Sequence, residues 1–300
     1  MLNRRDFLKT SAALAALSVL PAGLMSCSSK PKQKAIGVQL YSVRAELKND
    51  FDGTMKALAD MGYKLYESFG YSEGKFFGKT PKEMKQYMTD LGGKMTGSHT
   101  GMPYLRTDLS EEDITKYWDA WKVNVDNTAE LGCKWIVQAG YPVKQLQTID
   151  DVRRFAEQFN KCGEIAKSKG LKFAFHNHVE EFHAIDGEIP YDVLLNNTDK
   201  GLVTFQLDTA QMVIGGYQCH DYIKRYPGRF ANWHLKDADP DKQGSTEFGK
   251  GLVDFEALFA VADIAALEDY YVEQERYNVT PLEAMKIDYD FLVNAPYVKF

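Results

Sequence analysis

The stretch Phe173-Ala-Phe-His-Asn-His178 decides the fold, because an apolar run there ends abruptly in polar side chains. A short apolar run rich in aromatic residues predicts a buried β-strand. Three further apolar runs end in the same way, at Asp208, His234 and Glu273. Strands that all deliver polar side chains at their carboxyl ends are typical of a (β/α)8 barrel, whose functional residues meet on that one face.

Eight strand candidates alternate with helical segments after residue 34. This alternation predicts parallel strands covered by helices, and eight units favour an α/β TIM barrel over an open sheet. A doubly wound sheet is the alternative, but it calls for a glycine-rich loop after the first strand, where this chain has Ser42-Val-Arg44. The strand candidates are residues 35–41, 64–69, 94–99, 135–140, 171–176, 203–208, 231–235 and 270–274.

Helix start and stop signals stand between these strands. Thr80-Pro-Lys-Glu83 combines a capping box with proline at the first helical position. Ser110, Thr148 and Asp254 are further candidate caps, and glycine follows three of the helical segments, at positions 92, 132 and 170. The expected helices are residues 81–91, 111–131, 149–169, 255–266 and 281–292.

The first residues are a leader rather than part of the fold. Asn3-Arg-Arg-Asp-Phe-Leu-Lys9 is a twin-arginine pattern, and the apolar stretch over residues 11–25 is too short for a membrane span. Leu24-Met-Ser-Cys27 looks like a bacterial lipobox. We expect a signal peptide over 1–26, lipidated Cys27 and a tether over 27–34, and the barrel over 35–300. The predicted product is an exported periplasmic or outer-membrane lipoprotein, bound to the membrane by its lipid alone; an uncleaved membrane anchor is the alternative.

Composition excludes some function classes. The net charge of −6 at pH 7 argues against a nucleic-acid-binding protein, which needs a basic face. Hydrophobic residues make up 44% of the chain, which with its length fits one barrel domain. Beyond Cys27 the cysteines are Cys133, Cys162 and Cys219, and since their spacing matches no metal knuckle we expect buried free thiols.

The strand-end residues include candidate ligands and candidate proton carriers. His176 and His178 point to the same side of their strand, and two imidazoles there can bind a metal or move protons. A hydrogen-bonded structural pair is the alternative. Asp208 follows an apolar strand and is costly to bury unpaired, which favours a ligand over a plain helix N-cap. His, Asp and Glu together indicate a divalent-metal site.

Other strand ends complete the candidate site. His234 and Lys236 share one face; His234 is a candidate ligand, and Lys236 is either an electrophile that stabilises an oxyanion or a salt-bridge partner at the rim. Glu273 lies nearer its strand than Glu275 and is the preferred ligand. Secondary candidates, for contact with substrate hydroxyl groups or as a base, are Glu67 and His99.

Six segments carry a family resemblance: residues 36–44, 175–182, 207–208, 234–237, 248–254 and 272–274. In this order they resemble the xylose isomerase-like barrel superfamily, which includes sugar isomerases, epimerases, inosose dehydratase and endonuclease IV. The resemblance implies a metal, often manganese, held by a Glu, an Asp, a His and a second Glu. The last three fall on Asp208, His234 and Glu273, and the first falls on His176. We therefore expect Mn²⁺, with Co²⁺, Zn²⁺ and Mg²⁺ as alternatives.

The resemblance also implies chemistry beside a sugar carbonyl. A base takes the neighbouring proton, for which His176 and His178 are candidates, with Lys236 as oxyanion partner and Glu273 in the same catalytic group. Reprotonation of the enediolate isomerises or epimerises the sugar, whereas loss of a β-leaving group makes the enzyme a 3-keto-glycoside lyase or dehydratase. Histidine in place of the first glutamate weakens a two-carboxylate epimerase mechanism.

Export bears on the substrate. Phosphorylated sugars are mainly cytoplasmic, so we expect an unphosphorylated carbohydrate, and a partner oxidoreductase that supplies a keto-sugar fits the lyase alternative. A non-catalytic sugar-binding lipoprotein is another class, and retention of Asp208, His234 and Glu273 speaks against it. The charge and the leader speak against a DNA-repair enzyme like endonuclease IV.

Overall fold

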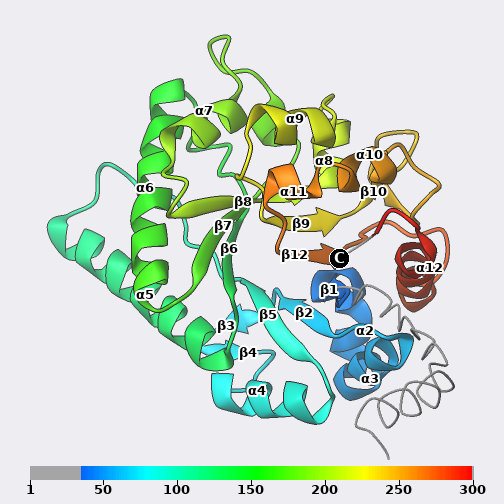
Figure 1. The fold of residues 1–300 in the computed structure, drawn as a ribbon. Helices are drawn as coiled ribbons and strands as arrows, with labels where there is room; N and C mark the ends of the chain where they lie inside the picture. The colour runs from blue at the N-terminus through cyan, green and yellow to red at the C-terminus, as the bar shows by residue number, and fades with distance from the viewer. Residues whose placement is uncertain (1–34, 299–300) are drawn as a thin grey trace, which may run out of the picture. The chain divides into compact units, whose positions relative to one another are not determined.

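The computed structural model describes residues 35–298, whose centre is a closed barrel of eight parallel strands (Figure 1). All eight expected strands are present, so the predicted (β/α)8 barrel is confirmed. In the order in which they neighbour one another, the strands are β1 (Gly37–Gln39), β12 (Asp269–Val272), β9 (Asn232–Leu235), β8 (Val203–Asp208), β7 (Lys172–His176), β6 (Trp135–Ala139), β5 (Lys94–His99) and β2 (Leu65–Ser68). The first strand pairs with both β2 and β12, which closes the barrel.

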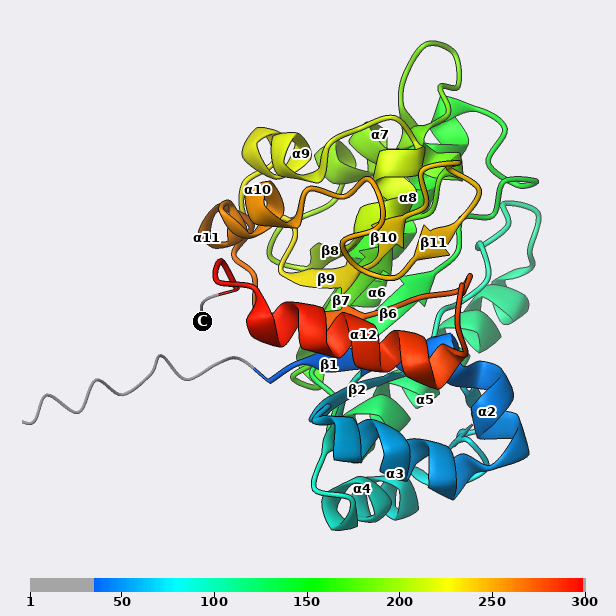
Figure 2. The same ribbon diagram turned by 90° about the vertical axis from the view of Figure 1, so that its right-hand side faces the viewer.

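The long helices begin where the capping signals predict. A capping box of Thr80 and Glu83 opens α4 (Pro81–Asp90), and Ser110 caps α5 (Glu111–Leu131). Thr148 opens α6 (Ile149–Ser168) with a second capping box. The last helix, α12 (Pro281–Asn294), packs against β12 and α3 (Phe51–Met61), and Figure 2 shows it lying along the outside of the barrel.

The expected single helix over 255–266 is wrong. Asp254 does cap a helix, but the chain forms two short ones, α10 (Phe255–Phe259) and α11 (Ala262–Ala265). Between them Val261 leaves the helical conformation, with φ −110° and ψ 13°, and is buried. A β-branched residue has a low helix propensity, so the burial of Val261 outweighs continuation of the helix.

The remaining short elements mostly enlarge the loops that follow the strands. In a TIM barrel these loops build the functional face. Apart from α8, whose N-cap at Asp208 was an alternative, none was expected from the sequence. They are η1 (Leu40–Val43), α2 (Arg44–Asn49), β3 (Tyr71–Ser72), β4 (Lys75–Phe76), η2 (Glu180–Phe182), α7 (Pro190–Asn197), α8 (Thr209–Ile214), α9 (Cys219–Arg225), β10 (Asp237–Ala238) and β11 (Ser245–Thr246).

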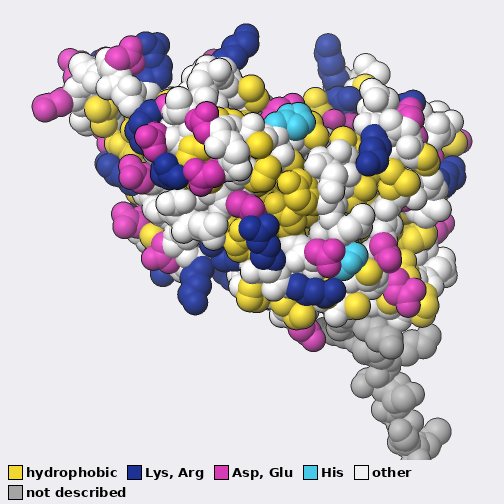
Figure 3. All heavy atoms as spheres, turned by 90° about the horizontal axis from the view of Figure 1, so that it is seen from above, with side chains coloured by type: hydrophobic (Ala, Val, Ile, Leu, Met, Phe, Trp, Pro, Cys, Tyr) yellow, Lys and Arg dark blue, Asp and Glu magenta, His cyan; other side chains and the backbone are white. Residues whose placement is uncertain are grey.

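The structure also bears on the cysteines and on the distribution of charge. Cys133, Cys162 and Cys219 are buried and free, as expected. Within residues 35–298, no helix is both long and apolar enough to cross a membrane. On the face drawn in Figure 3, basic and acidic side chains are interspersed. The signal peptide, Cys27 and the tether lie outside the described residues.

Gly37 tests the closure of the barrel. A Cβ at this position would come within 2.5 Å of the Tyr271 ring on the neighbouring strand, so Gly37→Ala should lower the free energy of unfolding by about 1–3 kcal/mol. The measurement is urea unfolding followed by circular dichroism. Gly201→Ala, in an exposed turn, is the control, and equal unfolding midpoints for both variants would contradict this packing.

Candidate metal and catalytic site

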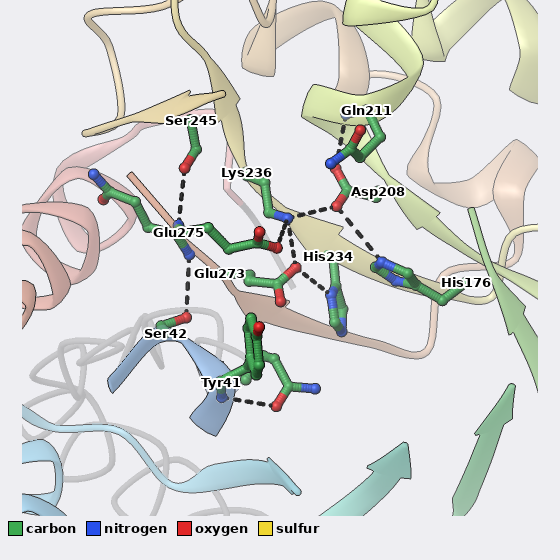
Figure 4. Close-up of polar contacts among 12 residues, drawn as sticks. Tyr41, Ser42, His176, Asp208, Gln211, His234, Lys236, Ser245, Glu273 and Glu275 are labelled. Carbon is green, nitrogen blue, oxygen red and sulfur yellow. Dashed lines mark hydrogen bonds and ion pairs between the residues drawn. The ribbon is translucent and has the colours of Figure 1, made fainter. Parts of the chain in front are cut away.

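The carboxyl ends of six barrel strands bring one polar cluster together. Figure 4 shows its members His176, Asp208, His234 and Glu273. The parallel register places His234 of β9 beside Asp208 of β8, and Glu273 follows directly after β12. Glu67 reaches His234 from β2, a strand that is not a neighbour of β8, β9 or β12. The members of the cluster are Glu67, His99, His176, Asp208, His234 and Glu273, all buried except the partly exposed His99.

His234 lies between two carboxylates. Its Nδ1 is 2.9 Å from Glu273 Oε2, and its Nε2 contacts Glu67 Oε2. Burial opposes the charged imidazole, but the two carboxylates outweigh burial and raise the pKa of His234 to about 10. Without a metal this residue is therefore an imidazolium that neutralises part of the charge of both glutamates.

Glu67 forms hydrogen bonds with three side chains and an ion pair with a fourth. Besides His234 it accepts from Gln39 Nε2 and Gln206 Nε2, each at 2.8 Å, and pairs with His99 at 3.1 Å. Burial alone would raise the pKa of Glu67, but the neighbouring histidines lower it to about 2. The Glu67 carboxylate is fully buried, and its contact with a substrate stays a prediction.

The glutamine at position 206 fixes how the histidines are protonated. Because its Nε2 donates to Glu67, its Oε1 faces His176 Nδ1 at 3.0 Å and accepts a hydrogen bond. His176 therefore carries its proton on Nδ1, and its Nε2 lone pair faces Asp208 Oδ2 across 3.7 Å. Burial lowers the pKa of His176 well below the usual value, so the ring is neutral and free to bind a metal through Nε2.

Lys236 joins the carboxylates on the other side of the cluster. Its Nζ lies 2.9 Å from both Asp208 Oδ2 and Glu273 Oε2, and 2.8 Å from Glu275 Oε1. Burial disfavours the ammonium, but these three carboxylates raise the pKa of Lys236 well above its usual value. The side chain is thus a buried cation that separates acidic groups.

The cluster fits a divalent cation. One ligand atom each from His176, Asp208, His234 and Glu273 can be chosen so that all four lie within 4.8 Å of one another. Asp208 uses Oδ1 to cap α8, accepting from the Gln211 amide at 2.9 Å, while its buried Oδ2 lacks an aligned hydrogen bond. Asp208 is therefore both the helix N-cap and a candidate ligand. Two nitrogen and two oxygen donors suit Zn²⁺, Co²⁺ or Mn²⁺.

The charge count points the same way. Four carboxylates meet here, from Glu67, Asp208, Glu273 and Glu275, against the cations Lys236 and His234. Four negative charges less two positive charges leave an excess of two negative charges. Glu275 is exposed, so the buried part of this excess is one negative charge, from three carboxylates and two cations. A buried charge is costly, and a bound cation would compensate it.

A pocket of about 340 Å³ opens beside the cluster. It is lined by Tyr41, Phe69, His99, Ala139, His176, His178, Glu273 and Glu275. The rings of His176 and His178 are 4.9 Å apart and face the same side, as strand alternation predicts. Lys236 does not line this pocket but a neighbouring one.

The structure adds functional residues that the sequence reasoning missed. Gln39 and Gln206 complete the hydrogen-bond network around Glu67. Gln206 is two residues before Asp208 and so lies on the same face of the strand, and this alternation could have identified it from the sequence. Glu181, in η2, is fully buried. Its Oε2 accepts from the His178 amide at 3.1 Å, and its Oε1 has no hydrogen-bond partner among the described residues. It anchors the histidine that lines the pocket.

Glu181 makes stability depend on pH. Burial raises the pKa of Glu181 from 4.5 to about 8, so between these values the folded chain keeps a proton that the unfolded chain has lost. The free energy of unfolding therefore falls as pH rises through this range. Glutamine stays neutral, so the free energy of unfolding of Glu181→Gln should rise relative to that of the wild type by about 2–5 kcal/mol between pH 5 and pH 8. One pKa unit corresponds to about 1.4 kcal/mol.

Urea unfolding at several pH values measures this difference. Glu180→Gln, at the exposed neighbouring position, should follow the wild type at every pH. A constant difference between Glu181→Gln and the wild type would show that Glu181 is already ionised in the folded protein.

Comparison with known proteins agrees with this fold. A profile of the xylose isomerase-like TIM barrel family matches residues 55–294, and one of the twin-arginine translocation signal sequence matches residues 1–21, which indicates export. An inosose dehydratase of Clostridium perfringens is 29% identical over 207 residues, covering 61% of this chain and 69% of that protein. Another, of Clostridium beijerinckii, is 26% identical over 272 residues, with coverages of 79% and 87%.

A solved structure is also similar. It is described as a sugar phosphate isomerase/epimerase from Parabacteroides distasonis, and it matches with a TM-score of 0.80 at 30% identity. The match covers 93% of this chain and 100% of that chain.

Proposed function

The chain belongs to the xylose isomerase-like TIM barrel family, and from this we propose that it is a divalent-metal-dependent enzyme that removes a proton next to the carbonyl of an unphosphorylated sugar. The observation that carries the proposal is the buried set of His176, Asp208, His234 and Glu273, which lies beside the pocket that His178 lines. This arrangement offers both a cation site and a neutral base at one cavity.

The metal would be held by His176, Asp208, His234 and Glu273. We favour Mn²⁺, with Co²⁺, Zn²⁺ or Mg²⁺ as alternatives. When bound, it supplies a Lewis acid that polarises the sugar carbonyl and stabilises the enediolate. Asp208 and Glu273 are held for this purpose by Lys236, and His176 is oriented by Gln206.

His178 is the preferred base. Burial, helped by the charge of Lys236, lowers the pKa of His178, so the ring is neutral and able to accept a proton. His176 has its Nδ1 engaged by Gln206 and its Nε2 directed at the candidate metal site, which leaves His178 for proton transfer. We assign Lys236 to positioning the carboxylates; its role as an oxyanion partner stays a prediction.

Two fates of the enediolate remain, and the names of similar proteins illustrate both. The Parabacteroides structure is called an isomerase/epimerase, whereas the Clostridium proteins are called dehydratases, enzymes that eliminate water. Isomerisation or epimerisation is our first proposal. Elimination from a 3-keto-glycoside is the second, favoured by His176, which stands where epimerases of the family carry a proton-moving glutamate.

The cellular setting is proposed with the reaction. The twin-arginine signal indicates export, which supports an unphosphorylated substrate. Lipidation of Cys27, a periplasmic or outer-membrane location and a partner oxidoreductase that supplies a keto-sugar are parts of this proposal.

Metal binding is tested with two aspartates that both cap helices. Asp208→Asn and Asp254→Asn each keep an oxygen that accepts the cap hydrogen bond, but only position 208 contributes to the cluster. Isothermal titration with Mn²⁺ and Zn²⁺ should show affinity reduced at least about tenfold in Asp208→Asn and unchanged in Asp254→Asn. Equal affinities for all three proteins would place the metal elsewhere.

The reaction is tested by NMR in D₂O with the metal-loaded protein, ketoses and 3-keto-glycosides. Deuterium entering next to the carbonyl with the aglycone retained supports isomerisation or epimerisation, and release of the aglycone supports elimination. His178→Gln should slow either process by about 10²-fold or more, whereas His183→Gln, at an exposed position nearby, should not. Bound metal with no exchange on any substrate would contradict the proposal.

A further inference from the structure

A second cavity, which we call the side pocket, adjoins the catalytic one. It has a volume of about 500 Å³, and its walls include Phe51, Phe69 and Phe77. Phe69 lines both cavities, and its ring packs edge-on against Tyr41 of the catalytic pocket at 5.1 Å. The residues at this junction follow β1 and β2, so both cavities open on the face where the strands end.

The aromatic wall of the side pocket is continuous and only half-buried. The Phe69 and Phe77 rings are 5.3 Å apart, and those of Phe77 and Phe51 are 5.4 Å apart. All three side chains keep part of their surface exposed, whereas the large aromatic residues of the barrel core are fully buried. Rings left partly exposed beside a catalytic pocket indicate a binding surface.

One of these rings, that of Phe77, is carried by a strained backbone. Phe77 has φ +50°, in the left-handed region that aromatic residues rarely adopt. Its amide donates to the Gly70 carbonyl at 2.9 Å, and a Cβ on Gly70 would come within 2.5 Å of the Phe77 ring. A glycine or asparagine at position 77 would relieve the strain, so the phenylalanine stands there against the local backbone preference.

The rim of the side pocket is basic, although the chain as a whole carries a net charge of −6. Arg44, Lys48 and Lys79 line it, against the single carboxylate of Asp52. Among residues 35–298, no carboxylate forms an ion pair with Lys48, and Lys79 Nζ lies 5.2 Å from the centre of the Phe51 ring. An anionic group in the pocket would meet Lys48, which no carboxylate of the described residues neutralises, together with Lys79 and Arg44.

We propose that the side pocket binds the aglycone of a glycoside whose sugar ring occupies the catalytic pocket, and that it selects a flat aromatic aglycone with an acidic substituent. This inference rests on the proposed function and narrows its substrate class to aryl glycosides. Stacking on the phenylalanine rings gives the preference for an aromatic group, and Lys48 and Lys79 give the preference for an anion.

The test measures binding rather than turnover. Isothermal titration of the purified protein with methyl, phenyl and 4-carboxyphenyl β-D-glucosides should show the phenyl glycoside binding about tenfold more tightly than the methyl one. The 4-carboxyphenyl glycoside should bind more tightly again, with an advantage that falls at high salt. Equal affinities for the methyl and phenyl glycosides, or no detectable binding of either, overturn the proposal.

Two variants with a matched control assign the preference to the pocket. Phe77→Asn suits the left-handed backbone, so it should keep the wild-type melting temperature or raise it, yet lose the preference for phenyl over methyl. Lys79→Met should lose the preference for the carboxylate, whereas Lys56→Met, at an exposed lysine paired with Asp60, should keep it. Retention of both preferences in the pocket variants overturns the assignment.

The outcome separates the two proposals. An aromatic preference without proton exchange on any keto-sugar removes the proposed reaction and leaves the aglycone site. Proton exchange on keto-sugars without any aromatic preference removes the aglycone site and leaves the proposed reaction.

Discussion

The placement of His234 between Glu67 and Glu273 is the interaction on which the rest of the site depends. Three ionisable groups are buried in contact, and each is tolerable only because the others compensate its charge. Removing one partner would leave an unpaired charge in the interior. The neighbouring side-chain amides of Gln39 and Gln206 donate hydrogen bonds to the Glu67 carboxylate. Gln206 also accepts from His176 Nδ1 and so determines which ring nitrogen carries the proton.

The barrel topology makes this compensation possible. Glu67 comes from β2 and His234 from β9, two strands that are not neighbours in the barrel, yet their side chains meet because both strands end on the same face. Gly97 on β5 makes room for the carboxylate, since a Cβ there would lie 2.4 Å from Glu67 Oε1. Lys236 pairs with both Asp208 and Glu273, which allows these two carboxylates to lie close together. The cluster still carries more negative than positive charges, which suits a bound cation.

Local signals in the sequence were sufficient for the strands, the helix caps and the polar strand ends. The Thr80 and Thr148 capping boxes and the run that ends at His176 depend only on neighbouring residues. The network around Glu67 was not predictable in this way, because it joins strands far apart in the chain. The break at Val261 and the left-handed Phe77 were missed for a similar reason: burial and packing override local preference at both positions.

Anomalous diffraction at the manganese edge from crystals of the Mn²⁺-loaded protein shows whether the buried strand-end cluster is a metal centre. We expect one strong peak bounded by His176, Asp208, His234 and Glu273. A peak at any other position would contradict this assignment. So would a map with no peak in which Lys236 still bridges Asp208 and Glu273 and His234 still lies between its two glutamates.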